Sequence, residues 1–118
     1  MTGRVWLVGA GPGDAGLITV RGRELLERAA VVVYDRLAGA GLLTLARTDG
    51  ELMDVFKEPG KHTRPQDGIH EVLIERARAG KEVVRLKGGD PFIYGRGWEE
   101  IEACYLAGVP CEVVPGVS

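Results

Sequence analysis

Five short runs of apolar, often β-branched residues alternate with stretches of helical periodicity, and this alternation constrains the fold more than any other feature. The runs predict strands at Arg4–Val8, Val31–Tyr34, Glu51–Phe56, Glu82–Leu86 and Cys111–Val114. The stretches between them predict helices at Leu17–Ala30, Gly41–Arg47, Gln66–Ala79 and Trp98–Ala107. Short strands that alternate with helices favour right-handed βαβ units around a parallel sheet. We therefore expect an α/β fold, with a five-stranded, mainly parallel sheet flanked by helices.

Helical spacing of apolar residues supports two of these helices in particular. The residues that can share one face of the first helix are Leu17, Leu25, Leu26 and Ala29. Those that follow helical spacing in the third are Ile69, Val72, Leu73, Arg76 and Ala77. Gly80 and Gly108 follow the last two helices, at positions where a glycine commonly ends a helix.

Composition and charge exclude several classes of protein. The 118 residues suit one compact domain, and no apolar run approaches the roughly 18 residues that a membrane span needs. The chain has 15 basic and 17 acidic residues, so it lacks the excess of positive charge that is typical of a nucleic-acid binder. The first residues show no secretory leader, and Cys104 and Cys111 lack metal-ligand spacing or a disulfide framework. We expect two buried thiols in a cytoplasmic protein.

Ligands of parallel α/β sheets bind beyond the carboxyl ends of the strands. The loops expected there are Gly9–Gly16, Asp35–Leu37, Phe56–Pro65, Gly88–Gly97 and Pro115–Ser118. The last of them begins after a strand and no helix follows it. We interpret this ending as a truncation or a domain boundary.

The loop Gly9–Gly16 holds four glycines in eight residues, which allows a ligand to approach the backbone closely. Three of them, starting at Gly11, satisfy G-x-G-x-x-G, and Asp35 ends the second strand where a ribose-binding acid would lie. Counted from the first glycine, however, Asp14 takes the place of the third. Pro12 also removes a backbone donor. A dinucleotide, another small-molecule cofactor and a structural turn all remain open for this loop.

The loop after the fourth strand favours a cofactor that lies across two strand ends. Gly88 and Gly89 expose backbone, and Asp90 precedes a proline that holds it extended, so its carboxylate can point into a cleft. A nicotinamide domain does not require such an element. The alternative is an ordinary turn between a strand and a helix.

Charged residues near the start of the last helix are candidates for substrate contacts. Arg96 lies between two glycines, so its guanidinium could bind a carboxylate with two hydrogen bonds. Glu99 could serve the same site or interact with the helix N-terminus, and for Glu100 we favour the latter role. Asp35, beside an arginine, could join the site or form a local ion pair.

No metal site is expected. His62 and His70 lack partners at metal-ligand or catalytic spacing, and we interpret both as surface residues. Lys57 and Lys61 could line the mouth of a cleft or belong to a solvated loop.

Five segments, in this order, resemble the uroporphyrinogen-III C-methyltransferases of the tetrapyrrole (class III) methylase family. They are V-W-L-V-G-A-G-P-G-D, V-V-V-Y-D-R-L, P-Q-D-G-I, V-V-R-L-K-G-G-D-P-F-I-Y-G-R-G-W-E-E and V-V-P-G-V-S. Together they cover nearly the whole chain. Phe56, Trp98 and Gly16 depart from the family pattern, which usually has glycine at the first two positions and an acid at the third.

The resemblance implies the N-terminal domain of a two-domain enzyme that holds S-adenosylmethionine between its domains and releases S-adenosylhomocysteine. The residues that would line the cofactor site are Pro12, Gly88, Gly89, Asp90 and Ser118. Asp35, Arg96 and Glu99 would face the tetrapyrrole, uroporphyrinogen III, which becomes precorrin-2 for siroheme, cobalamin or heme d1 synthesis. Members of the family usually form homodimers. The rival hypotheses are a nicotinamide-binding oxidoreductase domain and a non-catalytic fragment that dimerises or acts as a scaffold.

Overall fold

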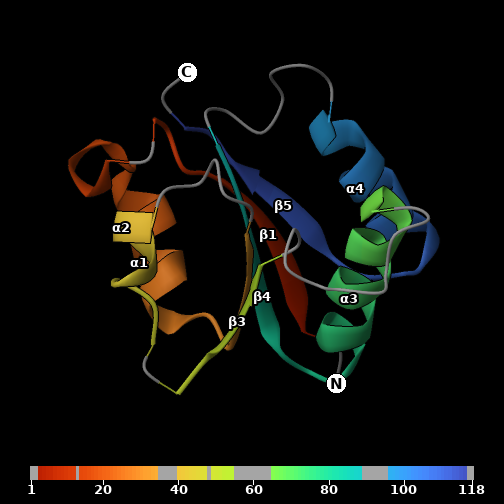
Figure 1. The fold of residues 1–118 in the computed structure, drawn as a ribbon. Helices are drawn as coiled ribbons and strands as arrows, with labels where there is room; N and C mark the ends of the chain where they lie inside the picture. The colour runs from red at the N-terminus through yellow and green to blue at the C-terminus, as the bar shows by residue number, and fades with distance from the viewer. Residues whose placement is uncertain are drawn as a thin grey trace.

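The structure, a computed structural model, describes residues 3–12, 14–34, 40–47, 49–54, 65–88 and 96–116. Its strands are β1 (Arg4–Gly9), β2 (Val31–Tyr34), β3 (Glu51–Asp54), β4 (Glu82–Lys87) and β5 (Cys111–Val114). They form one sheet in the order β3-β2-β4-β1-β5, and every neighbouring pair is parallel. The predicted α/β fold with a five-stranded parallel sheet is thus confirmed (Figure 1).

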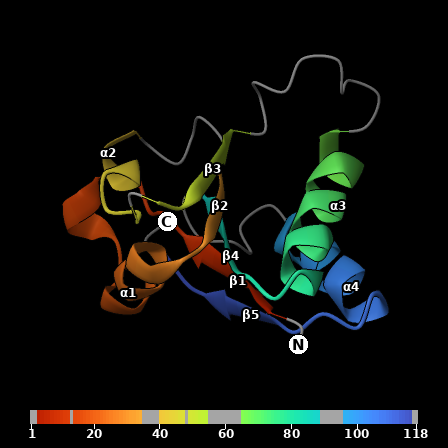
Figure 2. The same cartoon turned by 90° about the horizontal axis from the view of Figure 1, so that it is seen from below.

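Helices cover both faces of the sheet. In Figures 1 and 2, α1 (Val20–Arg28) and α2 (Ala40–Leu43) lie on one side, and α3 (Pro65–Arg78) and α4 (Arg96–Leu106) lie on the other. None of the helices in the described ranges has the length and apolar character that crossing a bilayer requires.

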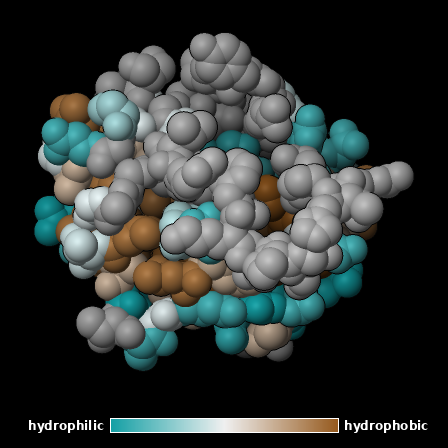
Figure 3. Space-filling model, in the orientation of Figure 1, coloured by the Kyte–Doolittle hydropathy of each residue, from teal (hydrophilic) through white to brown (hydrophobic). Residues whose placement is uncertain are grey.

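Two apolar clusters, one on each face of the sheet, make up the core. The buried members on the α1 and α2 side are Trp6, Val8, Ala10, Leu25, Leu26, Ala29, Val32, Leu42, Val84, Leu86 and Val114. Those on the α3 and α4 side are Val5, Leu7, Val31, Val33, Ile69, Leu73, Ala77, Val83, Cys104 and Val109. Because β1 and β2 are covered on both faces, their sequences are almost continuously apolar, whereas β4 also carries the buried Arg85 and Lys87. In the view of Figure 3, hydrophobic residues also show at the surface on the α1 side.

The first helix is shorter than predicted. Asp14 accepts a hydrogen bond from the Gly16 amide, and a 3-10 turn (η1, Ala15–Leu17) follows it. Thr19 then caps α1, because its hydroxyl accepts from the amide of Gly22 at 3.1 Å. The prediction that Leu17 shares the buried face was therefore wrong: Leu17 precedes the helix and is 46% exposed.

The other helices lie close to their predicted ranges, and their ends have simple causes. Gly80 and Gly108 adopt φ angles of 90° and 74°, as predicted for glycines that end α3 and α4. The predicted helix Gly41–Arg47 is only one turn long. Beyond Leu43 the backbone forms bonds between residues three apart, including Leu45 N to Leu42 O at 3.0 Å.

Arg76 follows the helical spacing of the apolar residues in α3, but its side chain is not part of the apolar cluster. Its guanidinium donates to both carboxylate oxygens of Glu51, at 2.9 and 3.0 Å, and so ties the end of α3 to the beginning of β3. These hydrogen bonds hold the pKa of Glu51 below its ordinary value of 4.5 and raise the pKa of Arg76.

Because the folded-state pKa of Glu51 is lowered, the pair stabilises the fold above pH 4.5, and this stability is lost as the pH falls through the lowered pKa. Glu51→Gln is expected to reduce the free energy of unfolding at pH 7 by roughly 1 kcal/mol or less, because the pair is partly exposed. Below pH 4.5 the difference from wild type should shrink, which urea unfolding at several pH values measures. A difference that stays constant into strong acid would contradict this assignment.

Candidate functional site

The two glycine-rich turns of the predicted site begin side by side. β1 pairs with β4 so that Gly9 lies opposite Lys87, and the Ala10 amide donates to the Lys87 carbonyl at 2.6 Å. The turn after β1 and the turn that starts at Gly88 therefore leave adjacent strands at the same edge. One small molecule can contact both.

Two further strands end at this edge. β5 lies on the other side of β1, with Val114 opposite Val8, and β2 lies beside β4, with Tyr34 opposite Leu86. All five strands run toward the top of Figure 1, so their carboxyl ends meet there. This is the edge at which ligands of parallel α/β sheets bind.

The described parts of both turns are partly accessible. Ala10 and Gly11 are buried, Pro12 is exposed and Gly88 is half-buried. Gly11 has φ 64°, in the left-handed region that favours glycine. At Gly88 the absence of a side chain leaves room for the close approach of a cofactor. The residues present therefore fit a small-molecule cofactor at the ends of β1 and β4.

The predicted substrate residues fall partly within the described structure. Arg96 is the first residue of α4, and Glu99 lies in the first turn of that helix with its side chain exposed. The remaining predicted site residues lie outside the described residues: Asp35, Gly89, Asp90 and Ser118.

Glu100 has a role that the sequence did not reveal. We expected it at the helix N-terminus in favourable contact with the helix dipole, but its side chain is fully buried and turned toward β4. Its Oε1 accepts a hydrogen bond from Lys87 Nζ at 3.0 Å, and Arg85 Nε lies 3.5 Å from the same oxygen. Lys87 and Arg85 are themselves only 8% and 4% exposed.

A sequence signal for this cluster did exist. Arg85 and Lys87 alternate with apolar residues in a strand that is otherwise apolar, so both side chains point to one face of the sheet. Buried cations require an acidic partner, and α4 supplies one in Glu100. The spacing alone could not show which of the two neighbouring glutamates would fill this role.

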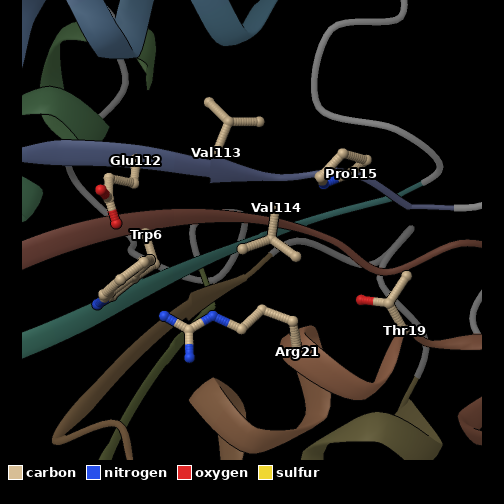
Figure 4. Close-up of a pocket in the computed structure, with 7 residues that line it drawn as sticks. All are labelled: Trp6, Thr19, Arg21, Glu112, Val113, Val114 and Pro115. Carbon is tan, nitrogen blue, oxygen red and sulfur yellow. The ribbon is translucent and has the colours of Figure 1, made fainter.

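A pocket of about 590 Å³ lies between α1 and the strands β1 and β5. Figure 4 shows Arg21 reaching from α1 toward Trp6 and Val114. Arg21 and Arg4 lie 5.0 and 5.4 Å from the Trp6 ring centroid, within cation–π distance. Its lining includes Val114, the last residue of β5, and the following Pro115, so the pocket reaches the carboxyl end of β5. The sequence did not predict it.

The cysteines lie together, although the sequence separates them into a helix and a strand. Both are free; Cys104 is buried and Cys111 is half-buried rather than buried as predicted. A hydrogen bond between the thiols lowers the pKa of Cys104 and raises that of Cys111. Among the described residues no group of three His, Cys, Asp or Glu side chains could hold a metal ion. His70 is half-buried on α3, and His62 lies outside the described residues.

Comparison with known proteins gives consistent matches. The family profile described as Tetrapyrrole (Corrin/Porphyrin) Methylases matches residues 4–118. The chain is 58% identical over 116 residues to siroheme synthase 2 of Pectobacterium atrosepticum and 57% identical to siroheme synthase 1 of Halorhodospira halophila. Each match covers 98% of this chain but only 25% and 24% of the relative.

Solved structures agree with these relatives. A uroporphyrin-III C-methyltransferase from Thermus thermophilus superimposes with a TM-score of 0.86 at 47% identity, over 100% of this chain and 49% of the other. A second structure of that name, complexed with S-adenyl homocysteine, gives 0.82 at 51% identity, over 98% and 49%. The chain thus spans about a quarter of the curated relatives and about half of these structures. With the profile matched along almost its whole length, the chain belongs to the tetrapyrrole methylase family.

Proposed function

We propose that this chain is the N-terminal α/β domain of an S-adenosylmethionine-dependent methyltransferase that C-methylates uroporphyrinogen III to precorrin-2. The observation that carries the proposal is the pairing of β1 with β4, which brings the two glycine turns together at one edge. The similar Thermus thermophilus proteins, one of them bound to S-adenyl homocysteine, support the cofactor and the substrate.

In this proposal the turns after β1 and β4 bind the cofactor, and the residues concerned are Pro12, Gly88, Gly89, Asp90 and Ser118. The bound cofactor supplies an already activated methyl group. The protein therefore has to bind and orient the tetrapyrrole, and it does not have to create an electrophile.

Arg96 and two acids are proposed to act on the substrate. Uroporphyrinogen III carries acetate and propionate arms, and a guanidinium binds such carboxylates with two charge-assisted hydrogen bonds. Arg96 would anchor one arm from the beginning of α4. Asp35 or Glu99 would accept a pyrrole N–H or assist proton loss after transfer.

The proposal extends to assembly and cellular location. Trp98, Tyr105 and Leu106 on α4 are 65%, 80% and 76% exposed, an apolar surface consistent with a homodimer. Free thiols are consistent with the cytoplasm. Precorrin-2 would feed siroheme, cobalamin or heme d1 synthesis, and the siroheme synthases among the relatives favour the first.

The test is made on the full-length gene product. Calorimetry with S-adenosylhomocysteine should detect binding, and Gly89→Val should weaken it by about tenfold or more, because the added side chain crowds the turn. Gly68→Val on α3 is the matched control, since a Cβ there meets nothing within 4 Å.

Methylation of uroporphyrinogen III by the wild-type protein is the second readout. Equal affinity of the wild type and Gly89→Val for the cofactor would contradict the assignment of the turn. Binding of NADH in place of S-adenosylhomocysteine would favour the rival oxidoreductase reading.

A further inference from the structure

We propose that the buried ion pair between Lys87 and Glu100 is a positioning device, which holds the first turn of α4, with Arg96 and Glu99, against the carboxyl end of β4. This inference rests on the proposed function, because it assigns the pair a role in presenting the substrate residues. It concerns two side chains that do not themselves touch cofactor or substrate in the proposed site.

The first argument is location. Lys87 is the last residue of β4 and directly precedes the Gly88 turn, while Glu100 lies one helical turn after Arg96. The contact between Nζ and Oε1, at 3.0 Å, therefore joins the proposed cofactor turn to the proposed substrate helix. β4 lies between β1 and β2 in the sheet and is hydrogen-bonded to both, so of the two elements that the ion pair joins, the strand is the rigid one and the helix is the one held in place.

The second argument is the way α4 packs. Its later turns hold to the sheet by apolar contacts, through Cys104 and the partly buried Ile101 and Ala107. Among the described side chains of its first turn, Trp98 and Glu99 are exposed and Glu100 is completely buried. Glu100 is thus the described side chain of this turn that is buried against the sheet, and its contact with Lys87 is polar and directional.

The third argument is energetic. A buried ion pair adds little to stability, because removing both charges from water offsets most of their attraction. Glu100 Oε2 is buried without a hydrogen-bond partner in the described part of the chain, which costs further stability. The hydrogen bond between Lys87 and Glu100 has a defined direction and length, so it fixes one position of the helix relative to the strand.

The experiment replaces both charges in the full-length gene product with Lys87→Met/Glu100→Met. Methionine has similar length and no charge, and its flexibility should let the start of the helix drift. The double variant also leaves the buried Arg85 without its acidic partner, so its free energy of unfolding should fall. We expect kcat/KM for uroporphyrinogen III to fall about ten- to hundredfold, as misplacement by about 1 Å does. The affinity for S-adenosylhomocysteine, set by the strand turns, should change less than about twofold.

Amide hydrogen exchange supplies a readout that is independent of turnover. The amides of residues 100–102, which donate to the first turn of α4, should exchange faster in the variant, while residues 104–106 keep their wild-type protection. If the double variant does not fold, Lys87→Met alone replaces it in both measurements. In this single variant the Glu100 carboxylate stays paired with Arg85, whose Nε lies 3.5 Å from Oε1.

Glu51→Gln is the matched control. The Glu51–Arg76 pair also ties a helix to a strand, but it does so where β3 begins, at the opposite edge of the sheet. This variant should lose some stability and keep kcat/KM within about twofold.

Two kinds of failure are distinguishable. Wild-type protein that neither binds S-adenosylhomocysteine nor methylates uroporphyrinogen III overturns the proposed function, and the positioning role with it. An active wild type together with a folded Lys87→Met/Glu100→Met variant of normal kcat/KM and normal exchange overturns the positioning role alone.

Discussion

Replacing Arg96 with alanine in the full-length gene product is expected to lower kcat/KM for uroporphyrinogen III about a hundredfold and to leave cofactor affinity unchanged. A hydrogen bond to a charged group contributes roughly 1.5–3 kcal/mol, and a guanidinium makes two such bonds to one carboxylate. Loss of both affects the anchored substrate, whereas the proposed cofactor turns follow β1 and β4. Steady-state kinetics and calorimetry measure the two effects separately.

Arg47→Ala provides the control for a lost positive charge. Arg47 is exposed, pairs with Asp49 and lies shortly before the start of β3, at the edge of the sheet opposite the carboxyl ends. Its replacement should change kcat/KM by less than about twofold. Normal formation of precorrin-2 by Arg96→Ala would remove Arg96 from the proposed substrate site.

Leu26→Ala is expected to lower the free energy of unfolding by about 3 kcal/mol. Leu26 is completely buried between α1 and the sheet, so truncation removes apolar contacts and leaves a cavity, which costs roughly 2–5 kcal/mol at such sites. Urea unfolding of the chain, followed through the fluorescence of buried Trp6, measures the change.

Truncation to alanine at an exposed position isolates the effect of burial. Val20, the first residue of α1, is 78% exposed, and Val20→Ala should change stability by no more than about 0.5 kcal/mol. Equal losses at Leu26 and Val20 would show that the cluster on the α1 side does not stabilise the fold as described.

Local patterns predicted most of the secondary structure. Short apolar runs, most of them β-branched, marked the five strands, and Gly80 and Gly108 marked the ends of two helices because glycine readily adopts their positive φ. The error at Leu17 has an equally local cause. A threonine at position 19 offers its hydroxyl to a free helical amide, and this hydrogen bond outweighs the apolar spacing that suggested an earlier start.

The candidate site was predictable only in outline. The rule that ligands bind at the carboxyl ends of parallel strands selected the loops, and the structure shows that the turns after β1 and β4 begin on adjacent strands. That these turns bind a ligand stays a prediction. The partner of Lys87 was not predictable, because Glu99 and Glu100 are chemically identical and only the rotation of α4 decides which one faces the sheet.

The sequence by itself determined the α/β class, the approximate elements and the glycine turns, since each depends on the backbone preferences and periodicity of neighbouring residues. Only the tertiary structure decided the strand order β3-β2-β4-β1-β5, the contact between Cys104 and Cys111, and the burial of Glu100 against Lys87. Such contacts join segments that are remote along the chain. Their free energy arises from packing many side chains at once, which no local pattern encodes.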